Sequence, residues 1–136
     1  MDLVINTDGA SRGNPGPASF GYIIKKRDAE VLHQEGKKIG INTNNVAEYT
    51  GVLEALKYVK DHYSHKGPHT IEVVADSLLI VSQLSGKYKL KSAHLKILFD
   101  QIKQLEGEVG TVTYRHVLRA NNFIADRLAN QALDRP

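Results

Sequence analysis

The stretch TDGASRGNPGPASFGYII, residues 7–24, contains the pattern that decides the fold. Just before and into it, residues 3–8 alternate between apolar and polar side chains, as the two faces of a β-strand require. Residues 8–17 are dense in Gly, Asn and Pro, which predicts a loop. An apolar cluster follows, so residues 18–26 predict a second strand. Two strands joined by a polar loop predict the antiparallel beginning of a β-sheet.

Beyond this stretch the pattern changes to an alternation of helices and strands. Apolar residues in 46–61 recur at helical spacing, whereas 70–75 is a β-branched run typical of a buried strand. The remaining predicted elements are a strand at 31–39, helices at 78–84 and 92–105, a strand at 111–118 and a final helix after residues 121–122. The order βββαβααβα predicts an α/β fold with a mixed sheet flanked by helices.

Composition limits the other classes of protein. A chain of 136 residues is sufficient for one domain, so we expect a single domain over residues 1–136. The absence of Cys excludes a disulfide scaffold, a thiolate zinc site and thiol catalysis. No apolar run approaches the roughly 20 residues of a membrane span and no basic leader is present, so we expect a cytoplasmic protein. The net charge of +3 is compatible with a nucleic-acid partner without demonstrating one.

Four acidic residues occupy related positions in this scheme. Asp8 and Asp76 are predicted to end the first and fourth strands, and Glu48 and Asp126 to lie in the first turns of helices. If those two strands are adjacent and parallel, all four carboxylates meet at one sheet edge. They would repel one another unless cations lay between them, and oxygen ligands favour Mg²⁺ or Mn²⁺. Two such ions about 4 Å apart can activate water for phosphodiester cleavage.

Each of the four residues also has an ordinary structural interpretation. Asp8-Gly9 is a common turn and Asp76-Ser77 a common helix cap. An acidic residue in a first helical turn complements the helix dipole, which would explain Glu48 and Asp126. A metal site is therefore supported only by the four residues together and by the motifs around them.

Those motifs resemble type 1 ribonuclease H. They are TDGASRGNPGPASFGYII, TNNVAEYTGVLEAL, VVADSLLIV and RANNFIADRLANQAL, and they occur in the order that the family has. The resemblance covers essentially the whole chain and implies a mixed five-stranded sheet with helices. It also implies endonucleolytic, Mg²⁺-dependent cleavage of the RNA strand of RNA–DNA hybrids, which leaves 5′-phosphate and 3′-hydroxyl ends.

The resemblance assigns the catalytic carboxylates to Asp8, Glu48, Asp76 and Asp126. They would hold two Mg²⁺ ions, with Mn²⁺ as a substitute. Asp8 would bridge both ions and Asp126 would hold the ion that activates the attacking water. Glu48 and Asp76 would hold the ion that stabilises the leaving 3′ oxygen.

Further matches imply which residues bind the hybrid. The wide minor groove of an A-form-like duplex displays the 2′-hydroxyls, and residues without bulk permit close backbone approach. The family positions that contact 2′-hydroxyls and minor-groove base edges correspond to Ser11, Gly13, Asn14, Asn44 and Asn45. Thr43 matches a position that binds a DNA-strand phosphate. Helix capping by Asn44-Asn45 is compatible with this role.

The sequence departs from the family at the loop before the last carboxylate, where many relatives have a mobile His. Arg119 resembles the Arg of an archaeal-like branch, and His116 is the alternative, although it falls inside the predicted last strand. We favour Arg119, which stays protonated and would attract a phosphate or stabilise charge rather than act as a base. Leu78 replaces a Gln of some relatives, which predicts the loss of one minor-groove hydrogen bond.

The chain also has no Trp-containing basic protrusion. A short run, Lys87, Lys89 and Lys91 with Tyr88, is either a phosphate-contacting substitute or a solvated basic loop. Weaker and less processive binding is the expectation. The histidines at 62, 65 and 69 are interpreted as solvated surface residues, because no fourth metal ligand lies near them in the sequence.

Three functional hypotheses follow. The first is a ribonuclease H that acts on RNA–DNA hybrids as a monomer, with no membrane partner. The second is a non-catalytic nucleic-acid-binding module on the same fold, which would usually have lost a carboxylate. The third adds double-stranded RNA as a substrate, since the archaeal-like branch can also cut it.

Overall fold

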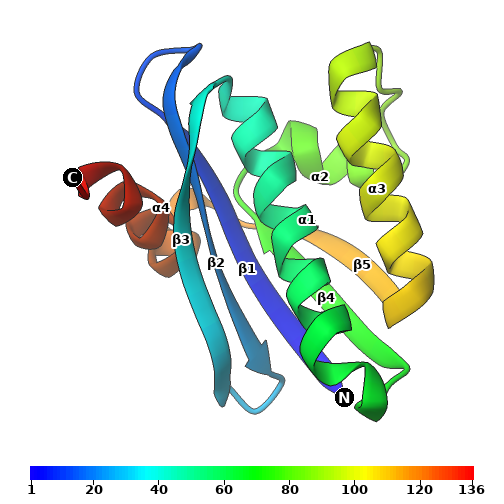
Figure 1. Ribbon diagram of the computed structural model, residues 1–136. Helices are drawn as coiled ribbons and strands as arrows, with labels where there is room; N and C mark the ends of the chain where they lie inside the picture. The colour runs from blue at the N-terminus through cyan, green and yellow to red at the C-terminus, as the bar shows by residue number, and fades with distance from the viewer.

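The computed structural model describes residues 1–136 as one five-stranded mixed sheet with helices on both faces (Figure 1). The strands are β1 (Asp2–Ser11), β2 (Gly16–Lys26), β3 (Val31–Asn42), β4 (His69–Ala75) and β5 (Gly110–His116). The helices are α1 (Asn44–Tyr63), α2 (Leu78–Leu84), α3 (Ala93–Val109) and α4 (Phe123–Asp134), with 3₁₀ turns η1 (Ser64–Lys66) and η2 (Arg119–Asn122). The predicted fold class is confirmed.

The strand order is β3-β2-β1-β4-β5. Strands β1, β2 and β3 pair antiparallel, whereas β4 pairs parallel with both β1 and β5. The first and fourth strands are therefore adjacent and parallel, as the carboxylate argument required. Their carboxyl ends lead to the same edge of the sheet, where α/β proteins usually bind ligands.

The predicted loop at residues 8–17 is wrong in its extent. Strand β1 continues to Ser11 and β2 begins at Gly16, so only residues 12–15 connect them, and Asp8 lies inside β1. Gly9 does not form a turn but lies within β1, where α1 packs against it. A Cβ on Gly9 would lie 2.4 Å from the backbone nitrogen of Glu48, so glycine here allows α1 to approach the strand.

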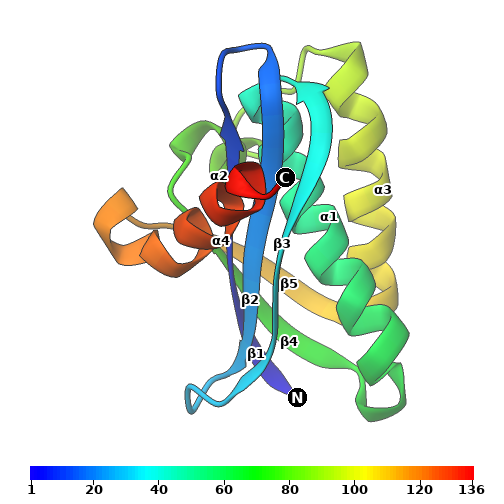
Figure 2. The same ribbon diagram turned by 60° about the vertical axis from the view of Figure 1, so that its left-hand side comes forward.

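The hydrophobic core lies between the sheet and α1, with α3 alongside (Figure 1). The predicted helical stripe of α1 is buried, as are the inward-facing residues of β1 and β4. The remaining helix, α4, covers the opposite face (Figure 2). It packs closely on β2 and β3. A Cβ on Gly21 would lie 2.4 Å from the Ala125 carbonyl oxygen, and a Cβ on Gly36 would lie 2.2 Å from the Leu128 carbonyl oxygen.

Three helices begin with a side-chain cap, including the one expected at Asp76-Ser77. The hydroxyls of Thr43, Ser77 and Ser92 each accept a hydrogen bond from the backbone nitrogen three residues later. The final helix has no such cap, because η2 precedes α4 and Asn122 makes no cap bond. The buried Asn122 amide instead donates to the Thr7 carbonyl at 2.9 Å, which ties the start of α4 to β1.

His69 corrects the prediction of solvated histidines. It is buried, its Nε2 donates to the carbonyl of Tyr63 at 2.9 Å, and its Nδ1 lies 3.1 Å from the amino group of Met1. Burial is the main cause that lowers the pKa of His69. His62 and His65 are exposed, as expected. None of the helices has the length and apolarity of a membrane span.

Candidate active site

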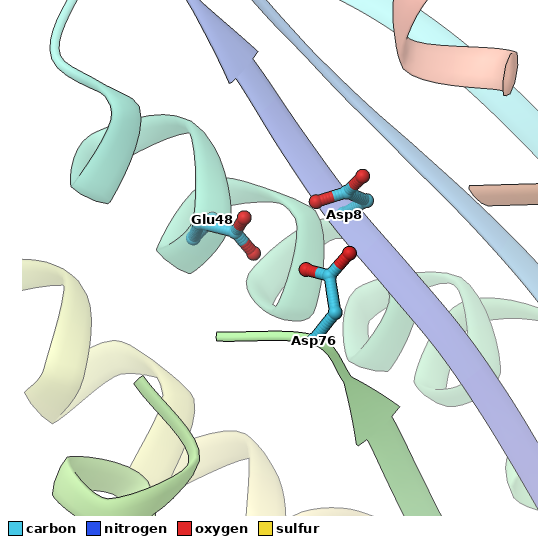
Figure 3. A group of neighbouring side chains, drawn as sticks. All are labelled: Asp8, Glu48 and Asp76. Atoms are coloured by element: carbon cyan, nitrogen blue, oxygen red, sulfur yellow. The ribbon is translucent and has the colours of Figure 1, made fainter. Parts of the chain in front are cut away.

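Three carboxylates from different elements meet at the edge of the sheet. Asp8 comes from β1, Glu48 from α1, and Asp76 directly follows β4. Their side chains point toward one another, and each offers an oxygen within 4.8 Å of the others (Figure 3). The parallel pairing of β1 with β4 and the approach of α1 at Gly9 bring them together.

Glu48 does not lie where the sequence predicted. Helix α1 begins at Asn44 and has no acidic residue in its first turn, so Glu48 belongs to the second turn. The effect of a helix dipole on charges falls off beyond the first turn, so dipole compensation does not explain this buried residue. Asp126 does lie in the first turn of its helix, as predicted.

Asp126 completes the group from α4. It lines the same open pocket, of about 400 Å³, as Asp8, Glu48 and Asp76. Its carboxylate lies outside the set of three whose oxygens fall within 4.8 Å of one another. The pocket therefore contains a compact trio and, beside it, a fourth carboxylate whose charge raises the pKa values of Asp8 and Asp76.

The electrostatics of the pocket disfavour four bare negative charges. Burial is the main cause that raises the pKa of Asp8 to about 7, and the charges of Asp76 and Asp126 add to it while a hydrogen bond with Glu48 opposes it. Burial also raises the pKa of Glu48 well above its usual range, followed by repulsion from Asp8. The pKa of Asp76 is raised by burial and then by Asp126. Such a cluster retains protons at neutral pH or is stabilised by cations.

One oxygen of the trio has no partner in the protein. Glu48 Oε2 is buried and accepts no hydrogen bond, although an unsatisfied buried polar atom is costly. The donor set around it consists of carboxylate oxygens only, which suits a hard divalent ion. The residues therefore fit a metal site of the Mg²⁺ or Mn²⁺ type.

Of the two candidate auxiliary residues, only Arg119 lines this pocket. Its Nη2 atom lies 3.4 Å from Asp126 Oδ1, and its side chain is 78% exposed, so it is free to meet a ligand. His116 is the exposed last residue of β5 and is not among the lining residues.

Two of the predicted hybrid-binding residues line the pocket, and the others lie in the two segments next to them. Ser11 and Asn44 line it, and Gly13 and Asn14 are exposed in the β1–β2 connection. Asn14 Oδ1 accepts from the Asn44 backbone nitrogen at 3.0 Å, so this connection contacts the start of α1. Thr43 and Asn45 belong to the same helix start but do not line the pocket. The hydroxyl of Thr43 accepts from the Val46 nitrogen at 3.2 Å as the helix cap.

Sequence reasoning missed Asn130. Its Nδ2 donates to Asp126 Oδ1 at 3.2 Å and to the Asp126 carbonyl at 3.0 Å, and the residue lines the pocket. The signal was available, because Asn130 follows Asp126 by four residues on a predicted helix and must share its face.

Comparison with known proteins gives matches over nearly the whole chain. The family described as reverse transcriptase-like matches residues 6–132. Ribonuclease HI of Halobacterium salinarum is 39% identical over 93% of this chain and 62% of its own length. Ribonuclease H of Polaromonas sp. is 31% identical over 98% of this chain and 89% of its own. The bifunctional protein Rv2228c of Mycobacterium tuberculosis is 42% identical, but this chain spans only 36% of its length.

Solved structures agree with these sequence relatives. LC11-RNase H1 in complex with an RNA/DNA hybrid has a TM-score of 0.93 and 39% identity, covering 97% of this chain and 96% of that one. RNase H1 of Halobacterium salinarum has a TM-score of 0.90 and 36% identity, covering 98% of both chains. The matched family, the relatives and the carboxylate pocket agree with one another: this chain belongs to the ribonuclease H family.

Proposed function

We propose that the protein is an endoribonuclease that hydrolyses the RNA strand of RNA–DNA hybrids with two divalent metal ions, leaving 5′-phosphate and 3′-hydroxyl ends. The observation that carries the proposal is the trio of Asp8, Glu48 and Asp76 in an open pocket, in which Asp8 and Glu48 are buried and one Glu48 oxygen is unpartnered. Family membership supports it, and so does the hybrid bound to the related LC11-RNase H1.

The four carboxylates would hold the metal ions, Mg²⁺ with Mn²⁺ as a substitute. When bound, the ions supply an activated water and stabilise the leaving oxygen. Asp8 would hold both ions, a role supported by its oxygen within 4.8 Å of Glu48 and Asp76 oxygens and by the Asp126 charge that helps to raise its pKa.

Arg119 has the role of a fixed positive charge at the pocket. It cannot accept a proton at neutral pH, so it serves to attract a phosphate or to stabilise developing negative charge. Its contact with Asp126 places it at the pocket, and its exposed side chain can reach a phosphate of the bound strand.

Selection of the RNA strand is assigned to the small and polar residues beside the pocket. Hydrogen bonds to 2′-hydroxyls distinguish RNA from DNA in a wide minor groove. The residues assigned to this recognition are Ser11, Gly13, Asn14, Asn44 and Asn45, with Thr43 on a DNA-strand phosphate. Double-stranded RNA is the second candidate substrate, favoured by an Arg rather than a His at position 119.

The experiment is a cleavage assay on end-labelled RNA–DNA hybrid, double-stranded RNA and double-stranded DNA in the same buffer. With Mg²⁺ or Mn²⁺ we expect cuts in the hybrid's RNA strand with 5′-phosphate ends, no cuts in chelator, and intact double-stranded DNA. Hybrid binding without turnover in either metal would favour a non-catalytic module. Robust cutting of double-stranded DNA would refute recognition through the 2′-hydroxyl.

A further inference from the structure

Arg12 connects the β1–β2 loop to the last helix of the chain. Its Nη2 atom lies 2.6 Å from Asp134 Oδ1 and 3.4 Å from the carbonyl oxygen of Asn130, both in α4. Arg12 also donates its backbone nitrogen to the Pro17 carbonyl at 2.9 Å, across the mouth of the loop. The guanidinium thus joins two segments that lie more than a hundred residues apart in the sequence.

The loop that Arg12 holds carries three of the predicted hybrid contacts. These are Ser11, Gly13 and Asn14, the neighbours of Arg12 in the sequence. Ser11 and Asn14 also form hydrogen bonds that hold the loop. Ser11 Oγ lies within hydrogen-bond distance of the carbonyls of Gly13 and Asn42 and can donate to one of them, and Asn14 Oδ1 accepts from the backbone nitrogen of Asn44, the first residue of α1. Those two bonds use side chains that are themselves proposed to bind the nucleic acid, whereas the Arg12 bond to α4 involves neither of them.

The backbone next to Asp134, the partner of Arg12, is held in place, although the Asp134 side chain itself is 65% exposed. Next to Asp134, the Arg135 guanidinium donates to the Gly36 carbonyl at 3.1 Å, and Lys38 Nζ donates to the Arg135 carbonyl at 2.5 Å. These bonds fix the end of α4 on β3. An exposed ion pair is usually weak because two mobile side chains must be ordered, and that cost is smaller when one end is already fixed.

The same helix face serves the catalytic carboxylate. Asn130 donates its side-chain amide to Asp126, while its backbone carbonyl accepts from Arg12. One turn of α4 therefore contacts both Asp126 and the side chain that holds the substrate loop. The position of the loop is coupled to the helix that supplies the fourth carboxylate.

We propose that Arg12 is a positioning residue for nucleic-acid binding: through Asp134 and the Asn130 carbonyl, α4 holds the β1–β2 loop in the conformation that presents Gly13 and Asn14 to the hybrid. The proposal rests on the proposed function for its substrate. Arg12 acts in this role through its Nη2 atom, which is bonded to α4, and its side chain is 48% exposed, so direct contact with the nucleic acid is the alternative that Asp134→Ala tests.

The test is steady-state kinetics on the RNA–DNA hybrid with wild-type protein, Arg12→Ala, Asp134→Ala and the exchanged pair Arg12→Asp/Asp134→Arg. Each single variant should raise KM by about three- to fivefold, which corresponds to the strongest ion pairs measured at exposed sites. Each should leave kcat within about twofold of the wild-type value. The exchanged pair should restore KM. Glu108→Ala is the matched control. It removes the 2.5 Å ion pair between Glu108 and Lys60, near the other end of α1, and should change neither KM nor kcat.

Asp134→Ala separates positioning from direct contact. If Arg12 bound a phosphate of the nucleic acid, removal of Asp134 would free it, so KM would stay constant or fall and the exchanged pair would remain impaired. Either result overturns the proposal, as does a wild-type KM in both single variants.

A second measurement does not depend on cleavage. The backbone ¹⁵N order parameter of Gly13 in the free protein should fall in Asp134→Ala and remain at the wild-type value in Glu108→Ala. An unchanged order parameter in Asp134→Ala overturns the coupling. If the wild-type protein does not cut the hybrid, the proposed function fails, while this measurement still decides the coupling.

Discussion

Glu48 shows at the scale of one residue why the carboxylate group points to function. It is buried, one of its oxygens has no hydrogen-bond partner, and the neighbouring Asp8 carboxylate repels its charge. It lies beyond the first turn of α1, so the dipole of its helix compensates little. A residue in this position costs folding free energy in the metal-free protein, and a bound cation would remove that cost.

The pH dependence of stability follows from the same group of residues. The pKa of Asp8 rises from 3.8 to about 7 in the folded protein, chiefly through burial, and those of Glu48 and Asp76 rise as well. Between pH 3.8 and about pH 7 the folded state binds more protons than the unfolded state. The contribution of these carboxylates to the free energy of unfolding therefore decreases as pH rises.

Urea denaturation in chelator, from about pH 4 to about pH 8, measures this slope. Asp8→Asn, which cannot titrate, should flatten it relative to the wild type. The same slope in wild-type and variant proteins would contradict the assignment of raised pKa values to this cluster.

Arg119 gives a second prediction at the residue scale. Arg119→Ala should lower kcat on the hybrid by about tenfold to a hundredfold, less than the removal of a direct oxyanion donor, because the charge beside Asp126 is lost. Arg119→Lys should retain part of the rate, since it keeps the charge. His116→Ala is the control, and a loss of rate there with none in Arg119→Ala would reverse the assignment.

At the scale of elements, glycines in the strands mark where helices approach. The sequence at residues 8–17 was predicted as loop because of its Gly, Asn and Pro content, yet β1 continues through Gly9. The same principle applies at Gly36, where α4 lies against β3. Glycine content alone does not distinguish a turn from a close helix contact, so the sequence could not give the ends of these strands.

Two glycine substitutions test this explanation with opposite signs. A Cβ on Gly36 would lie 2.2 Å from the Leu128 carbonyl oxygen, so Gly36→Ala should lower the free energy of unfolding by about 1–3 kcal/mol. Gly107 lies in α3 with no atom within 4 Å of its added Cβ, so Gly107→Ala should raise it by about 0.5–1 kcal/mol. Urea denaturation measures both, and a stabilising Gly36→Ala would contradict the close packing of α4.

The connection between α2 and α3 is the other element with a testable role. Lys87, Lys89 and Lys91 are exposed there, and none forms an ion pair. If they contact phosphates, replacing all three by Ala should weaken hybrid binding and reduce the slope of log K against log salt by up to about three. A control triple at the far end of α1 and in η1 should leave the slope unchanged: Lys57, Lys60 and Lys66. An unchanged slope in the first triple would identify the run as a solvated loop.

At the scale of the whole molecule, the parts that depend on local pattern were predictable and the long-range contacts were not. Helical periodicity predicted α1, and alternation together with element order predicted a mixed sheet. The adjacency of the first and fourth strands was only a condition of the carboxylate argument, and the structure supplied it. The hydrogen bond of Asn122 to β1 and the ion pair of Arg12 with Asp134 join distant segments. No local sequence signal distinguishes such residues from caps or solvated charges, so the structure was needed to find them.

The central claim is that the pocket lined by Asp8, Glu48, Asp76 and Asp126 performs metal-dependent cleavage. Its most direct test is hybrid cleavage in Mg²⁺ by the wild-type protein and by Asp8→Asn, with circular dichroism to verify that the variant is folded. The amide removes one negative charge from the centre of the group with little change in shape. We predict that the wild-type protein cuts the RNA strand and that folded Asp8→Asn does not. Undiminished Mg²⁺-dependent cleavage by the variant would contradict the account.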